Sequence, residues 1–88
     1  MKPEGDIALL LEYWGNVVSS RTSEEVDKWS DEIIKLHQKN QWVIGYTGPT
    51  PSLIVVSNDI HNVPDGIIDA DEFRNFGHAK PAQFFIKE

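Results

Sequence analysis

The acidic segment Asp65–Glu72 comes closer to a known binding chemistry than any other part of the chain. It reads Asp-Gly-Ile-Ile-Asp-Ala-Asp-Glu, which matches the second half of an EF-hand calcium loop, with glycine at position 6 and glutamate at position 12. With Gly66 as position 6, however, the first ligand would be His61 and the third would be Val63. Neither supplies the oxygen that a hard cation prefers. We therefore interpret the segment as a turn followed by an acidic loop, and predict no metal site.

Other reactive residue types lack the neighbours that catalysis needs. The chain contains no cysteine, which excludes thiolate chemistry, disulfides and cysteine-based zinc sites. No serine lies in a nucleophile elbow, and no glycine-rich phosphate loop is present. The three histidines show no spacing of four residues that would pair two ligands on one element. Adjacent carboxylates such as Glu24 and Glu25 are typical of solvated faces. We predict no enzyme activity, no catalytic residues and no cofactor.

Large aromatic rings are the remaining candidates for a binding role, because they offer a wide and rigid contact area to sugars and peptides. Trp29 falls on the apolar stripe of a predicted helix and is assigned to the core. Packing is also favoured for Trp14 and Trp42, which lie beside aliphatic neighbours. Tyr46 ends a predicted strand just before the loop at 47–51, and is the best ligand-binding candidate. Trp42 remains a second one.

Size and charge restrict the partners. Eighty-eight residues with 40% apolar and 25% charged content are typical of a single small globular unit. The formal charge of −6 and the absence of any run of basic residues argue against nucleic acid and against an anionic membrane surface. We expect residues 1–88 to form one unit with a small core.

Two helices are predicted in the first half of the chain. Asp6 can cap a helix over about 6–14, and Gly15-Asn16 is a suitable stop. Thr22 with Glu25 forms a capping-box pattern, which predicts a second helix over about 22–40 that ends at a cap on Asn40. Its apolar stripe repeats at spacings of three and four through Val26, Trp29, Ile33 and Leu36.

The second half predicts short strands. Strand-forming residues at about 42–46 and 53–57 indicate a hairpin, with Gly45 at a bulge or a close backbone approach. The unbroken apolar run in the second strand predicts burial on both of its faces. The region 69–80 is polar and is expected to be an irregular acidic loop, and a short terminal strand follows at 84–86. The fold class is α+β.

Several segments resemble, in their order along the chain, the C-terminus of one known family. They are residues 42–51 (Trp-Val-Ile-Gly-Tyr-Thr-Gly-Pro-Thr-Pro), the strand Leu53–Val56, Asn58, Asn-Val-Pro at 62–64 and the end of the chain at 81–87. Behind an amphipathic helix that ends near Asn40, this order resembles the family 5 extracellular solute-binding proteins of ABC importers. The resemblance extends from about Thr22 onward. Relatives often carry a tryptophan-rich stretch where residues 67–72 are acidic and aliphatic, which leaves the solute class open.

The resemblance implies that the chain is a C-terminal fragment of a two-lobed, periplasmic-binding-protein-like fold. The parent protein would capture oligopeptides, oligosaccharides or related solutes outside the cytoplasm and deliver them to an ABC permease. The N-terminal residues lack the apolar segment of a signal peptide, which the fragment interpretation places elsewhere in the parent chain. Its partners would be the rest of that chain, the permease and the solute, and the fragment alone would not bind solute. The alternative is a small standalone acidic interaction module, dimeric through the stripe that includes Val26 and Leu36.

Overall fold

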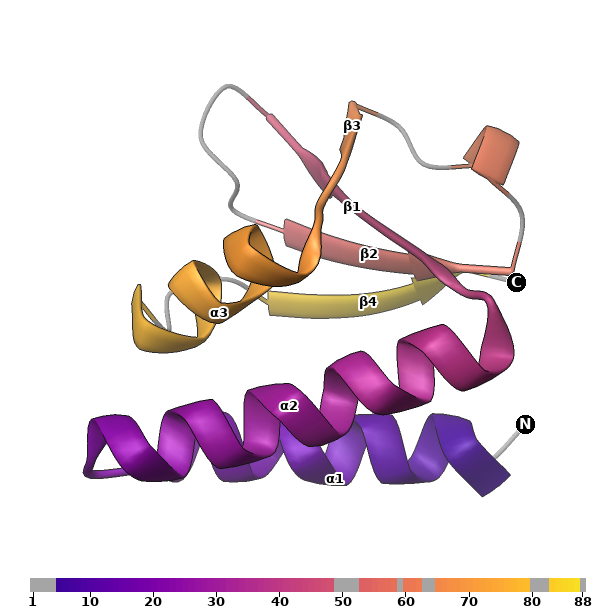
Figure 1. The fold of residues 1–88 in the computed structure, drawn as a ribbon. Helices are drawn as coiled ribbons and strands as arrows, with labels where there is room; N and C mark the ends of the chain where they lie inside the picture. Colours follow the sequence, from indigo (N-terminus) through magenta and orange to yellow (C-terminus); the bar gives the residue numbers. More distant parts are fainter. Residues whose placement is uncertain (1–4, 49–52, 59, 63–64, 80–82, 88) are drawn as a thin grey trace.

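The computed structural model describes residues 5–48, 53–58, 60–62, 65–79 and 83–87, which form three α-helices and a four-stranded mixed sheet. This confirms the α+β class. The elements follow one another as α1 (Gly5–Ser19), α2 (Ser23–Asn40), β1 (Val43–Thr47), β2 (Leu53–Ser57), the 3-10 turn η1 (Ile60–Asn62), β3 (Gly66–Ile67), α3 (Ala70–Ala79) and β4 (Gln83–Lys87). The three α-helices lie on one side of the sheet (Figure 1).

The sheet has the order β3-β1-β2-β4. β1 pairs antiparallel with both β2 and β3, whereas β4 pairs parallel with β2. Because α3 lies between β3 and β4 in the sequence, the chain can cross over and place β4 parallel to its neighbour. The β1–β2 ladder is unbroken from Val43↔Ser57 to Thr47↔Leu53, so Gly45 does not form a bulge with β2.

The predicted hairpin and terminal strand are confirmed within one residue at each end. β2 is central in the sheet, and its residues from Ile54 to Ser57 are all buried, as its apolar run predicts. The β1–β2 loop was predicted from prolines at 49 and 51, which lie outside the described residues.

Helix α1 is longer than predicted, and its stop at Gly15-Asn16 is wrong. The helix continues to Ser19 because Val17, fully buried, extends the apolar stripe formed by Leu10 and Trp14. Its end is set by serine: the hydroxyl of Ser20 donates to the Asn16 carbonyl at 2.6 Å. A side chain that satisfies a free carbonyl of the last turn can take the place of a glycine cap.

The start of α2 is confirmed. Thr22 has an extended backbone, and its Oγ1 accepts a hydrogen bond from Glu25 N at 3.2 Å. The predicted Asn40 cap is wrong by one residue, because the left-handed residue is Gln41, with φ 55°. Asn40 instead donates from Nδ2 to the Leu36 carbonyl at 2.9 Å.

The predicted irregular acidic loop over 69–80 is wrong, because this region forms α3. Asp69 caps it: its Oδ1 accepts a hydrogen bond from Glu72 N at 2.8 Å, the geometry of an N-cap. The helix buries Phe73 and Gly77, which lie four residues apart on one face. Because one of these two residues is a glycine, the sequence shows only a weak apolar stripe here, and the helix was missed. In the structure the glycine allows α3 to pack closely against α2.

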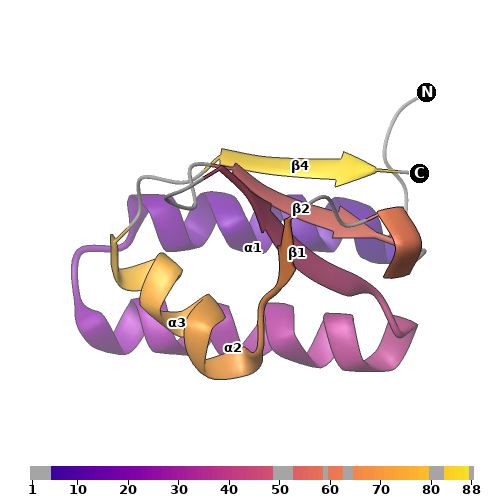
Figure 2. The same ribbon diagram turned by 90° about the horizontal axis from the view of Figure 1, so that it is seen from above.

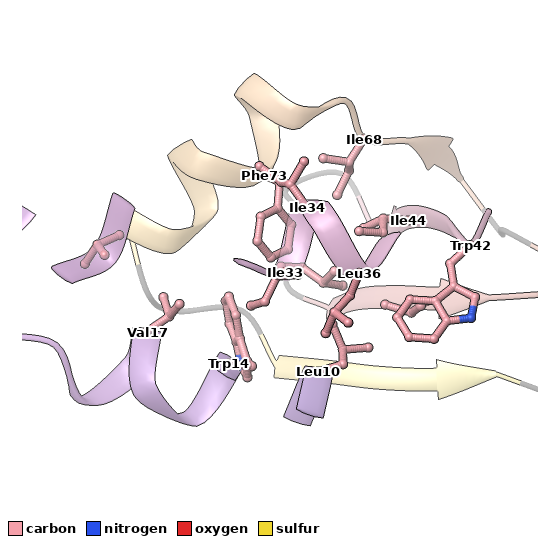
Figure 3. Packing of buried hydrophobic residues seen from close by; sticks show 13 residues of the cluster. Leu10, Trp14, Val17, Ile33, Ile34, Leu36, Trp42, Ile44, Ile68 and Phe73 are labelled. Carbon is pink, nitrogen blue, oxygen red and sulfur yellow. The ribbon is translucent and has the colours of Figure 1, made fainter. Parts of the chain in front are cut away.

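The core lies between the sheet and the helices (Figure 3). Figure 3 shows Phe73 directed from α3 into this cluster, toward Ile33 of α2. Of the stripe predicted as a dimer surface, Val26, Ile33 and Leu36 are buried inside the chain itself, and Trp29 is partly buried at the margin of the core. Most of that stripe therefore packs against the chain's own elements.

Candidate functional site

Tyr46, the best ligand candidate of the sequence, packs against a glycine. Its cross-strand partner in the β1–β3 ladder is Gly66. A Cβ placed on Gly66 would come within 2.8 Å of the Tyr46 ring and hydroxyl, so the ring covers the glycine backbone directly. Tyr46 is half-buried against the core on the helix side of the sheet. Its ligand-binding role stays a prediction.

The tryptophans pack largely as expected. Trp14 and Trp42 belong to the core, and Trp42 is 6% exposed. Figure 3 shows the Trp42 indole at one end of the buried cluster. Trp29 lies at the margin of the core, where it stacks on Tyr13 at a centroid distance of 5.3 Å. The structure does not bring Trp42 and Tyr46 together at one exposed surface, and a ligand role for Trp42 also stays a prediction.

The carboxylates that resembled a calcium loop hold the backbone instead. An oxygen of Asp65 accepts a hydrogen bond from the Gly48 amide, next to the end of β1. Asp69 is occupied as the cap of α3. Among the described residues, no three His, Cys, Asp or Glu side chains come together as a metal site. The acidic segment thus fixes the passage from the sheet into α3.

An ion pair and a second polar contact join α2 to α3. Arg74 donates from Nη2 to Asp31 Oδ1 at 2.6 Å, and His78 Nε2 lies 2.8 Å from Asp27 Oδ1. The hydrogen bond with Asp31 is the main cause that raises the pKa of Arg74 above its usual value, and the negative charge of Asp31 adds to it. These partly exposed pairs are suited to fixing the orientation of the two helices, and contribute little to stability.

A second polar contact joins the start of α1 to the end of α2. Asp6 accepts a hydrogen bond from Asn40 Nδ2 at 2.9 Å and lies 3.1 Å from Lys39 Nζ. The hydrogen bond with Asn40, followed by that with Lys39, lowers the pKa of the Asp6 carboxyl. This contact is structural, and it closes the antiparallel helix pair at one end.

His37, in the last turn of α2, is a partly buried titratable group. Its Nδ1 is buried and has no hydrogen-bond partner among the described residues. Burial lowers the pKa of His37 below 6.5, while a hydrogen bond with the Trp42 backbone acts in the opposite direction. Protonation would place a second N–H donor in this poorly solvated position, which disfavours the charged form.

We therefore expect His37 to make stability depend on pH. The unfolded chain binds the proton more tightly, so this contribution is present above pH 6.5 and is lost as the pH falls through 6.5 toward the lower folded pKa. Urea unfolding across this range measures the effect. A His37→Gln variant serves as the control and should lose less stability on acidification than the unmodified chain. Equal losses in both would contradict the assignment.

The exposed apolar side chains are the functional candidates that sequence reasoning missed. Among the residues that the structure describes, four large ones are exposed: Leu11 (37%), Val18 (48%), Ile67 (58%) and Phe85 (51%). Ile67 and Phe85 share the sheet face that points away from the helices, since they align with Gly45 and Val55 respectively. Leu11 and Val18 lie on α1. Such surfaces can bind another polypeptide, but offer no group for catalysis.

The comparisons add no relative to these observations. A scan of protein-family models and searches of curated proteins and of solved structures found no match to this chain. Within the part of the chain that the structure describes, no helix is both long enough and apolar enough to span a membrane.

Proposed function

We propose that the chain is the C-terminal part of a family 5 extracellular solute-binding protein. The parent protein would capture oligopeptides or related solutes and hand them to an ABC permease. The resemblance of residues 42–51, 62–64 and 81–86 supports this proposal. In this view the 88 residues serve as a structural part of one lobe and carry no catalytic role.

The observation that carries the proposal is the one-sided cover of the sheet. The α-helices occupy one face (Figure 1), while Ile67 and Phe85 leave more than half of their side chains exposed on the other. A sheet that is apolar on both faces is normally packed on both. In a two-lobed parent, a further layer of the same lobe would cover Ile67 and Phe85.

Solute capture would then require the rest of the parent chain. The two sequence candidates support this view, since Trp42 is buried and Tyr46 packs over Gly66. We expect the 88-residue chain to bind no solute in calorimetric titrations with a mixture of short peptides. Binding with a defined stoichiometry by the chain alone would contradict the proposal.

Two experiments test whether the chain is a fragment: inspection of the gene upstream of Met1, and binding of the chain to the rest of the parent protein. We expect an open reading frame that continues upstream of Met1 in frame and begins with a signal peptide. The protein encoded upstream should bind the 88-residue chain, and Ile67→Asp should weaken that binding at least tenfold because it places a charge in the covered layer. Val18→Asp, on α1 and outside this face, is the matched control. A ribosome-binding site directly before Met1, with no upstream frame, would refute the proposal.

The second candidate function is a standalone interaction module. It is favoured by Leu11 and Val18, two exposed apolar residues one helical heptad apart on α1, which the outer layer of a parent lobe would not cover. This module would be dimeric, although not through the α2 stripe, since Val26, Ile33 and Leu36 are buried.

A further inference from the structure

β4 is an edge strand with little of the usual protection. It pairs with β2 through all five residues from Gln83 to Lys87, and no described strand lies on its other side. Figure 2 shows it along the outer border of the sheet. Natural edge strands avoid pairing with other chains through charges, prolines, bulges or a covering element. β4 contains no proline, its register with β2 is regular, and Lys87 is its one charged residue.

The surface of α1 beneath this edge is also apolar, because Leu11 and Val18 are exposed there. α1 runs under β4, with Trp14 and Phe84 at a centroid distance of 4.9 Å (Figure 2). Tyr13 marks the side of α1 that faces α2, because it stacks on Trp29. At about 100° per residue, Leu11 and Val18 project from roughly the opposite side of the helix. They therefore point away from α2, on the same side as the free edge of β4.

We propose that two copies of this chain associate through the free edge of β4 and the side of α1 that contains Leu11 and Val18. β4 then pairs antiparallel with β4 of the second copy, and α1 packs against its counterpart. The twofold axis passes through Phe85, because this register pairs all five strand residues. A shift by two residues would leave strand positions unpaired, and a shift by one would reverse the faces. The two sheets then form one continuous eight-stranded sheet, in which Phe85 of one copy lies opposite Phe85 of the other.

The scarcity of charged residues in the strands lets a second copy approach this edge, in spite of the net charge of −6 on each chain. In the four strands described, Lys87 is the only charged residue, and the antiparallel register places its position opposite Gln83. The exposed positions Ala8 and Gly15 share the side of α1 with Leu11, and their small size lets the two helices approach.

The inference specifies the interface of the dimeric module given above as the second candidate, and it does not rest on the solute-binding proposal. Sedimentation equilibrium from micromolar to millimolar concentration should show twice the chain mass of 10.0 kDa. Phe85→Lys should give the monomer mass, because two like charges would meet at the axis. Ile67→Lys, on the same sheet face but in β3 at the other edge, is the matched control and should stay dimeric. A monomeric unmodified chain across this range would overturn the proposal.

Disulfide trapping tests the register without depending on charge. The chain has no cysteine, so Phe85→Cys introduces a single thiol. Directly opposed residues of antiparallel strands have Cα atoms about 4.5–5.5 Å apart, within the range of a disulfide. Under mild oxidation we expect nearly complete covalent dimer from Phe85→Cys and little from Ile67→Cys. Equal cross-linking of both variants would overturn the register, and circular dichroism shows that both are folded.

Discussion

Replacement of Phe73 by alanine is expected to cost about 3–5 kcal/mol of unfolding free energy, as for other large aromatic residues removed from protein cores. The side chain is 1% exposed. Its ring lies 6.0 Å from that of Trp14 and 6.1 Å from that of Phe84, measured between centroids. It therefore joins α3 to α1 and to β4, and alanine would leave a cavity where these elements meet.

The loss should be visible as a transition at much lower urea concentration than in the unmodified chain, followed by tryptophan fluorescence and circular dichroism. Small domains have total stabilities of only about 5–15 kcal/mol, so partial unfolding without urea is within the expected range. Ile67→Ala is the control: its side chain is exposed, and we expect a change within about 0.5 kcal/mol. A loss below about 1 kcal/mol for Phe73→Ala would show that α3 does not pack as described.

How far the sequence predicts the fold depends on where each element obtains its stability. The second helix was predictable because its cap at Thr22 and its stripe through Ile33 are local signals. α3 was not predictable, because its buried face contains Gly77. The need for a glycine there is apparent only once α2 is packed against it. The same holds for the end of α1, where Val17 is held by tertiary packing after a glycine that locally favours a stop.

The candidate surface was harder to predict than the core. Trp14 and Trp42 were correctly assigned to packing from their aliphatic neighbours. Val18, in contrast, fell beyond the predicted end of the first helix, so its alignment with Leu11 on one side of α1 could not be seen. Phe85 was recognised as part of an apolar terminus, but its exposure follows from the parallel pairing of β4 with β2. Pairing between distant strands is not encoded in local periodicity.

The free energy of unfolding should also be highly sensitive to the size of residue 77. A Cβ on Gly77 would lie 2.8 Å from Ser30 Oγ and 3.2 Å from Val26 Cγ1, so the backbone of α3 packs directly on side chains of α2 at this point. Gly77→Leu would force α3 away from α2, strain the Asp31–Arg74 pair and cost about 3 kcal/mol or more. Urea unfolding followed by circular dichroism measures the loss.

Substitution of Ser30 measures how much of the cost of a side chain at position 77 comes from contact with the Ser30 hydroxyl. Its Oγ is buried and has no hydrogen-bond partner among the described residues, so Ser30→Ala should be tolerated. Gly77→Ala gains about 0.8–1.0 kcal/mol in helix propensity but meets the hydroxyl, and we expect a net loss. In the Ser30→Ala background the hydroxyl is absent, and Gly77→Ala should become neutral or stabilising. This predicts a coupling of about 1–2 kcal/mol between the two positions, within the range for residues in contact. Strictly additive effects would mean that the backbone separation of α2 and α3 is larger than the structure shows.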